Sequence, residues 1–209
     1  MGGTEETMTK ACNNEQQDGV TNFKLGRTVL GFAFTLIYIM LLSAPADAFD
    51  GKLKGFVAGF GLGAAPTAHW SSSQVAEDIT ETGYAGEMLI GYAWDDNNVL
   101  VYDGSGAMYY HTDVDRVWIM QGIDAVRWYH YWGNQKHRYF TAAGLGAFFL
   151  GTNYCNVYGE GIGYSLGVGR EVFKQVQAGL YVMGGHTSNS YGVKANHFVV
   201  SLLVTIVAY

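Results

Sequence analysis

From residue 49 onward, hydrophobic positions alternate with small or polar ones, and clusters of polar residues interrupt the alternation at intervals. The alternation is plainest in Gly55–Ala64, where Phe60 and Leu62 are separated and flanked by glycines. A repeat of two residues is that of a β-strand, whose successive side chains point to opposite faces of the sheet. The pattern predicts eight strands, at residues 55–64, 82–94, 99–110, 117–132, 138–149, 159–172, 176–185 and 197–209.

The polar breaks between these strands alternate in length. They are long after the first, third, fifth and seventh strands and short after the second, fourth and sixth. An even number of strands joined by long loops at one end and short turns at the other is typical of outer-membrane barrels. The sequence therefore predicts an all-β, eight-stranded, antiparallel up-and-down transmembrane β-barrel. The soluble alternative, an eight-stranded ligand-carrying barrel, would need polar outer faces.

The final segment, His197–Tyr209, is a long apolar strand that ends on an aromatic residue. In water it would be an exposed, aggregation-prone edge. In a closed barrel it pairs with the first strand, and lipid covers its apolar face. This ending resembles the closing strand of Gram-negative outer-membrane barrels. The resemblance implies that the barrel-assembly machinery recognises this strand and that the protein lies in the outer membrane.

The N-terminal region has the pattern of a secretory signal peptide. Lys24 and Arg27 precede the apolar run Thr28–Leu42, and Ala46-Asp47-Ala48 provides small residues for cleavage before Phe49. The apolar run is short for a helix that has to cross a hydrocarbon core of about 30 Å. We therefore expect this segment to be cleaved.

These features divide the chain into three parts. Residues 1–23 are polar and have no apolar periodicity, so we interpret them as a non-structural extension from an over-long gene model, and we expect translation to start near Val20. Residues 24–48 are the predicted signal peptide. Residues 49–209 are the predicted outer-membrane barrel, and their length fits one domain.

The composition of residues 49–209 narrows the function classes. Nine Lys and Arg stand against thirteen Asp and Glu, a net charge of −4, so nucleic acid is not an expected partner. The 24 glycines and 27 aromatic residues favour packed strands with aromatic belts. The histidines lack the spacing of a metal site, and phosphate-binding and dinucleotide motifs are absent from the sequence. We expect no metal and no cofactor.

Aromatic residues gather where the predicted strands meet the short turns. Amphipathic rings are enriched at the interface between lipid and water. The predicted periplasmic aromatic girdle consists of Tyr92, Trp94, Trp128, Tyr131, Trp132, Tyr139 and Tyr209.

On each strand, the alternate positions that include the glycines are predicted to face the lumen. These positions give a polar lumen network of Glu87, Asp103, Asp124, Arg138 and Glu171. Side chains fill the interior of an eight-stranded barrel, and charges buried there need partners. Arg138 and Glu171 fall at the same end of neighbouring strands, so we expect them to pair. Arg127 and Trp128 do not fit the alternation of their strand, which predicts a β-bulge there.

The segment His186-Thr187-Ser188-Asn189 follows the seventh predicted strand. It resembles the H-x-S-N motif of the lipid A deacylases, which are eight-stranded outer-membrane barrels. The resemblance implies that His186 is a general base and Ser188 a nucleophile, both facing lipid. That family orients the histidine with a carboxylate on the next strand, whereas His197–Tyr209 contains no acid. Glu160 is the nearest substitute.

The pattern of the whole of residues 49–209 is similar to that of the OmpA/OmpX-type superfamily of small outer-membrane barrels. The resemblance implies a structural, envelope or surface-interaction role without catalysis. Lipid A ester hydrolysis and the passage or binding of a small molecule are the alternatives. Outer-membrane lipid and lipopolysaccharide are the expected partners, and we expect a monomer.

Overall fold

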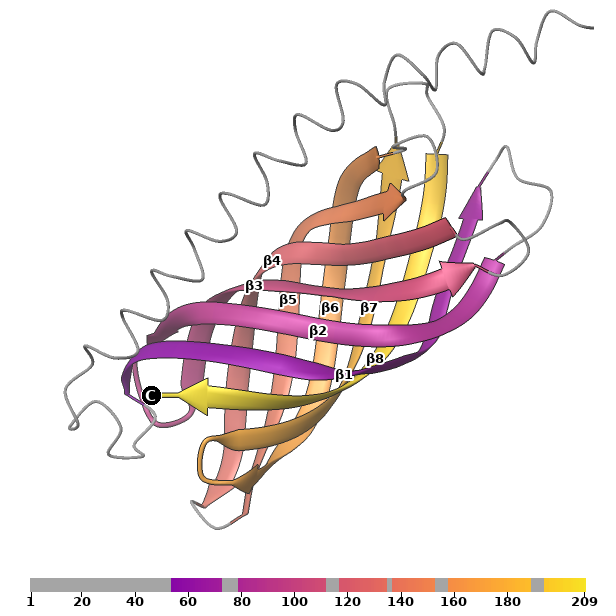
Figure 1. The fold of residues 1–209 in the computed structure, drawn as a ribbon. Helices are drawn as coiled ribbons and strands as arrows, with labels where there is room; N and C mark the ends of the chain where they lie inside the picture. The colour runs from indigo at the N-terminus through magenta and orange to yellow at the C-terminus, as the bar shows by residue number, and fades with distance from the viewer. Residues whose placement is uncertain (1–53, 73–78, 112–116, 135–136, 153–157, 189–193) are drawn as a thin grey trace, which may run out of the picture.

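The protein forms a closed β-barrel, which a computed structural model describes for residues 54–72, 79–111, 117–134, 137–152, 158–188 and 194–209. The predicted N-terminal extension, signal peptide and cleavage site lie outside these residues. Eight antiparallel strands follow one another around the barrel (Figure 1). They are β1 Gly55–Ser72, β2 Ile79–Ala93, β3 Asn98–His111, β4 Val117–Asn134, β5 His137–Thr152, β6 Tyr158–Phe173, β7 Val176–Ser188 and β8 Lys194–Ala208.

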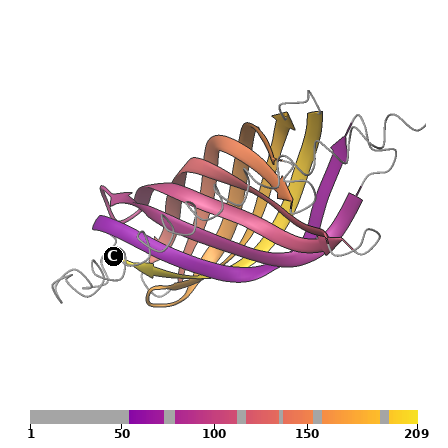
Figure 2. The ribbon, with the colours of Figure 1, turned by 45° about the horizontal axis from the view of Figure 1, so that its top comes forward.

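Each strand pairs with the next one along the chain, and the last strand returns to the first. β1 and β8 lie antiparallel, from Ala58 opposite Ala208 to Ser72 opposite Ala195. Figures 1 and 2 show these two strands, in indigo and yellow, side by side at the seam of a tilted, twisted wall. Closure gives every strand two neighbours and so leaves no unpaired edge among the described strands. The predicted eight-stranded up-and-down barrel is confirmed.

The connections alternate in length as the sequence predicts. Residues 73–78, 112–116, 153–157 and 189–193 join the strands at one end, and residues 94–97, 135–136 and 174–175 join them at the other. Short turns face the periplasm in barrels of this type. The end with the short turns, where the chain also finishes at Tyr209, is therefore the periplasmic end.

Several strands extend further than the sequence predicts. The expected loop over residues 65–80 is wrong at both ends, because β1 runs on to Ser72 and β2 begins at Ile79. Pro66 lies where the register shifts between Ala65 and Ala68, and this irregularity accommodates a residue that has no N–H to donate. Likewise, β7 continues through Ser188, which the break after residue 185 had excluded.

Asp95 organises the short turn between β2 and β3. Its carboxylate accepts hydrogen bonds from the backbone N–H groups of Asn97 and Asn98 at 2.7 and 2.8 Å, and from the side-chain amide of Asn98. The Asn98 side chain first, and then these backbone donors, lower the pKa of Asp95 below its ordinary value of 3.8. The turn is therefore held by an ionised side chain.

The outer wall of the barrel is apolar. Large hydrophobic side chains occupy outward positions on every strand, and Leu145 and Ile162 expose 71 % and 81 % of their surface. A continuous apolar surface of this kind needs lipid around it, and a closed barrel is one of the two backbone arrangements that lipid tolerates. The polar outer faces that a soluble carrier would need are not found on the described strands. Separately, no helix among the described residues is long and apolar enough to cross a membrane.

The parity of β4 differs from the prediction. Its register with β3 and β5 is continuous, so the expected bulge at Arg127 and Trp128 is wrong. Arg127 points inward and Trp128 outward, which places Asp124 on the outer wall beside Tyr102 instead of in the lumen. The prediction failed because it assumed that glycine marks the inner face, whereas Gly122 of this strand faces outward.

Candidate functional site

Arg127 is the centre of a polar cluster in the lumen, and its side chain is fully buried. Its Nη1 donates to Asp103 Oδ2 at 2.6 Å, and its Nε and Nη2 donate to the hydroxyls of Ser165 and Ser105, each at 3.0 Å. The guanidinium also lies over the ring of Tyr181, 5.1 Å from the ring centroid. One side chain of β4 thereby connects β3, β6 and β7 across the barrel.

Two buried carboxylates share this guanidinium. Glu87 on β2 lies 3.4 Å from Arg127 Nη1 and is 2 % exposed, and Asp103 on β3 is fully buried. Glu87 also accepts a hydrogen bond from the Thr205 hydroxyl on β8. Gly61 permits this approach, because a Cβ there would lie 2.6 Å from Thr205 Oγ1 and 2.8 Å from Glu87 Cγ. The structure thus places Glu87 and Asp103 in the lumen, where the sequence predicted them.

Aromatic rings fill the lumen around the same guanidinium. Tyr129 accepts a hydrogen bond from Arg127 Nη1 at 3.2 Å, and its ring packs 5.5 Å from that of Phe140. Phe140 in turn lies 6.2 Å from Tyr181. All three rings are 2 % exposed or less. Side chains therefore occupy the cross-section of the barrel at this level, as expected for eight strands.

His197 forms a second polar layer nearer the extracellular end. Its Nδ1–H donates to Gln121 Oε1 at 2.9 Å, and its Nε2 accepts from the Thr187 hydroxyl at 2.7 Å. The ring stacks on Phe148, with the two centroids 5.1 Å apart. These contacts link β8 to β4, β5 and β7 through the interior.

The expected ion pair between Arg138 and Glu171 is replaced by two separate contacts. Both side chains lie on the inner face, but Arg138 Nη2 donates to the backbone carbonyl of Asp96 at 3.1 Å, and Glu171 accepts from the Tyr209 hydroxyl. The Arg138 guanidinium also lies over the ring of Tyr131. The pairing prediction therefore fails, because each group contacts a different partner at the periplasmic mouth.

The predicted aromatic girdle divides into outward and inward rings. Those that face lipid at or towards the periplasmic end are Tyr92, Trp94, Trp128, Trp132 and Tyr139, all about half exposed. Contrary to the prediction, Tyr131 and Tyr209 point into the barrel and are 5 % and 4 % exposed. Position near a strand end suggested a girdle for all seven, but the parity of each strand decides which rings reach the lipid.

His186 and Ser188 lie on the outer face at the extracellular end of β7. Both side chains are exposed. Asn196 on β8 lies directly opposite His186 in the register, and its Oδ1 is 2.9 Å from His186 Nδ1. The amide oxygen can only accept, so His186 donates from Nδ1 and keeps the lone pair of Nε2. This is the tautomer that a general base requires, oriented by an amide and not by a carboxylate.

Charged residues flank Ser188 on both sides. In the register, Glu160 of β6 and Lys194 of β8 stand opposite Ser188. Glu160 is thus beside the serine, whereas Ile162 stands opposite His186. Glu160 therefore does not occupy the position from which a carboxylate would orient His186. The described residues contain no cluster of His, Cys, Asp and Glu that could hold a metal ion.

Sequence reasoning missed Arg127 and Asn196, the residues on which the two sites depend. The signal for the lumen cluster was present in β8, where Ser201 and Thr205 interrupt an otherwise apolar strand at one parity. Polar residues on a single face of a lipid-covered strand mark the lumen side. The signal for Asn196 was weaker, because a partner for His186 was sought among carboxylates alone.

A closed eight-stranded antiparallel barrel with an apolar outer wall and a polar, filled interior is the architecture of a small transmembrane β-barrel of the outer-membrane kind. The protein accordingly belongs in the outer membrane. Searches against protein-family models and curated proteins found no match.

Among solved structures, the chain is similar to Neisserial surface protein A, with 15 % identity over 73 % of this chain and 96 % of that chain and a TM-score of 0.48. For Ail, the attachment invasion locus protein of Yersinia pestis, the identity is 8 % over 73 % and 99 % of the two chains, with a TM-score of 0.43. For the outer membrane protein OprG from Pseudomonas aeruginosa, the identity is 10 % over 76 % of this chain and 97 % of that chain, with a TM-score of 0.45. At these identities no function is transferred.

Proposed function

We propose that the protein is a structural or surface-interaction component of the outer membrane that works through its outer surfaces and not through its lumen. The observation that carries this proposal is the buried cluster of Arg127, Glu87 and Asp103, packed among Tyr129 and Tyr181. An interior that is filled and cross-linked by charged hydrogen bonds serves to hold the wall together. It argues against the alternative of a continuous path for small molecules.

Ion flux tests this role. The purified barrel is inserted into planar lipid bilayers and into vesicles loaded with a potassium-sensitive dye, with a known porin as the positive control. We expect conductance and flux no greater than in protein-free membranes. Discrete conductance steps from the wild-type barrel would overturn the proposal and favour the passage of small solutes.

A second candidate function, hydrolysis of a lipid ester, is favoured by the contact between His186 and Asn196. In this scheme His186 Nε2 takes the proton of the Ser188 hydroxyl as the serine oxygen attacks an ester carbonyl. The ester C–O bond then breaks, and His186 gives the proton to the departing alcohol oxygen. Water, activated by the same histidine, hydrolyses the acyl-serine and releases the fatty acid. The Asn196 amide stabilises the orientation of the ring, as an asparagine does in some cysteine-protease triads. The site faces lipid at the extracellular rim, so an acyl ester of lipid A is the substrate class within reach.

Mass spectra of lipid A separate the two candidates. They are compared for cells with no protein, with wild type, and with Ser188→Ala, His186→Asn or Asn196→Ala. Thr82→Ala, which removes an exposed hydroxyl from β2, is the matched control. Unchanged spectra in all strains agree with the structural role. Loss of one acyl chain with wild type and Thr82→Ala, but not with Ser188→Ala, would establish the esterase instead.

The partners follow from the same surfaces. Outer-membrane lipid and lipopolysaccharide contact the apolar wall and its rims, and β8 is the segment that the barrel-assembly machinery would engage. The barrel closes on itself within one chain, which supports a monomer.

A further inference from the structure

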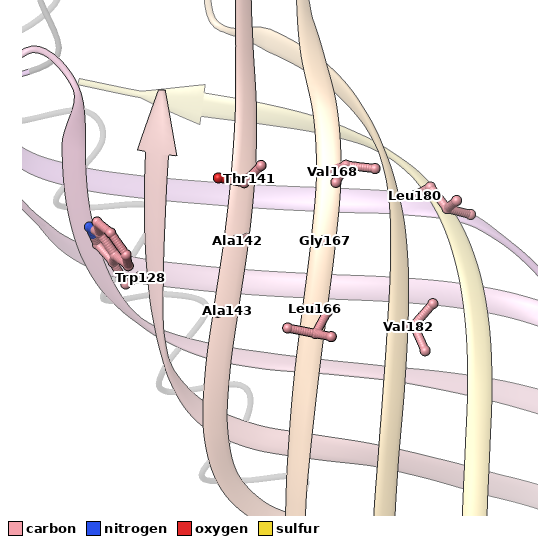
Figure 3. Close-up of a pocket in the computed structure, with 9 residues that line it drawn as sticks. All are labelled: Trp128, Thr141, Ala142, Ala143, Leu166, Gly167, Val168, Leu180 and Val182. Carbon is pink, nitrogen blue, oxygen red and sulfur yellow. The ribbon is translucent and has the colours of Figure 1, made fainter. Parts of the chain in front are cut away.

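An apolar hollow lies on the outer wall of the barrel, in its periplasmic half. It has a volume of about 410 Å³ and extends over β4, β5, β6 and β7. Figure 3 shows Trp128 at one edge of the hollow, Leu180 and Val182 at the other, and the backbone around Ala143 and Gly167 between them. Its size and apolar lining suit a hydrocarbon chain.

The register explains why the wall is hollow at this point. One row of outward residues runs from Trp128 to Ala143, Leu166 and Val182. Ala143 is the small member of this row, and it stands between the indole of Trp128 and the side chain of Leu166. The depression is therefore encoded by the sequence and does not arise from a gap between strands.

A cation lies directly beyond the periplasmic side of the hollow. The row after Val168 and Leu180 contains Arg170, which is exposed and stands opposite Tyr139 and Ala178. Arg170 follows Val168 by two residues on β6, a separation of about 6.6 Å along the strand. The Arg170 guanidinium lies 5.6 Å from the centroid of the Tyr139 ring, within the girdle that marks the membrane interface.

A second cation, Lys174, follows in the exposed turn between β6 and β7. Apolar hollow, aromatic ring and cations thus succeed one another from the lipid core to the periplasmic surface. An anionic phospholipid has the same order of chemistry, from acyl chain to phosphate. Guanidinium groups are well suited to phosphate oxygens, because they donate in a planar fork.

We propose that this face binds one glycerophospholipid of the periplasmic leaflet, with an acyl chain in the hollow and the phosphate on Arg170. The site is distinct from the extracellular rim and from the lumen, so the proposal holds whether or not the barrel is an esterase. Its occupant differs from ordinary boundary lipid because it is held at both ends.

Native mass spectrometry of the detergent-purified barrel, titrated with palmitoyl-oleoyl phosphatidylglycerol, tests the proposal. We expect one lipid to remain bound to wild type. Ala143→Phe fills the hollow and should weaken this binding about tenfold, whereas Ala147→Phe, on the same face of β5 but outside the hollow, should not. Arg170→Gln should also weaken it about tenfold, whereas Lys54→Gln, which removes an exposed cation at the same end of the barrel, should not.

A second titration with palmitoyl-oleoyl glycerol, which has the same chains without a phosphate, separates the two halves of the site. We expect it to bind wild type about tenfold more weakly than phosphatidylglycerol. Heat-modifiable gel migration identifies the folded variants. Equal retention of phosphatidylglycerol by Ala143→Phe and Ala147→Phe, or by Arg170→Gln and Lys54→Gln, would overturn the proposal, and so would equal binding of the two lipids.

Discussion

At the scale of single residues, the lumen is dominated by one cation placed between two acids. Arg127 contacts Asp103 and Glu87 with its Nη1, and all three side chains are buried. Removing the guanidinium would strand two carboxylates in a medium that solvates them poorly. Removing an acid as well would relieve part of that cost. The cluster is therefore a coupled unit, and its members should not behave additively.

The first prediction tests this coupling. Arg127→Met should lower the free energy of unfolding by about 3–5 kcal/mol, because it leaves buried charges without their partner. Adding Asp103→Asn to Arg127→Met should restore part of the loss. Urea unfolding of the barrel in lipid vesicles measures both changes. Lys54→Met, which removes an exposed cation, is the control. A loss of stability in Lys54→Met as large as that in Arg127→Met would contradict the assignment.

At the scale of the strand elements, the short turns fix which strand ends meet the periplasm. The turn after β2 depends on Asp95, whose carboxylate accepts hydrogen bonds from Asn97 and Asn98. These bonds lower the pKa of Asp95 in the folded barrel. A carboxyl with a lowered folded pKa stabilises the fold above its unfolded pKa, and this contribution is lost as the pH falls through the folded pKa.

The second prediction follows from the lowered pKa of Asp95. Asp95→Ala should lower the urea midpoint relative to wild type at pH 7, and the difference should shrink as the pH falls below the ordinary aspartate value of 3.8. Asp96→Ala is the matched control, because Asp96 contributes its backbone carbonyl to the contact with Arg138. A difference between wild type and Asp95→Ala that stays constant with pH would show that the charge has no part in the turn.

At the scale of the whole molecule, the seam between β1 and β8 turns a sheet into a barrel. The chain ends with Tyr209, whose ring is buried and whose hydroxyl donates to Glu171 on β6. This contact anchors the end of the closing strand from inside the lumen. An end fixed in this way aligns β8 with β1 and removes the open edge.

The third prediction concerns this seam. Deleting Tyr209 or adding a short charged tail after it should lower the yield of folded protein in the outer membrane, because the last strand loses its anchor. An insertion of equal length in the connection at residues 153–157 should have little effect, since loops tolerate added residues. Heat-modifiable migration of outer-membrane fractions provides the measurement. Equal losses at the two positions would argue against the closing role of β8.

The fourth prediction concerns the chain before the barrel. Cleavage after Ala48 should leave a mature protein that begins at Phe49, because small residues follow the apolar run at the expected distance. N-terminal sequencing of protein from the outer-membrane fraction identifies the first residue. An intact N-terminus in that fraction would show that the segment is retained.

The sequence by itself determined the strand number, the alternation of long and short connections, and the apolar outer wall, because each of these depends on local periodicity. Parity alone also placed Glu87 and Asp103 inside the barrel. The tertiary structure decided that Arg127 and not Asp124 is the central charge, and that Tyr209 points inward. These outcomes depend on pairing registers, and a register shift of one residue exchanges the two faces of a strand. Likewise, only the pairing of β7 with β8 brings Asn196 to His186, since side chains ten residues apart meet across a ladder that no local pattern specifies.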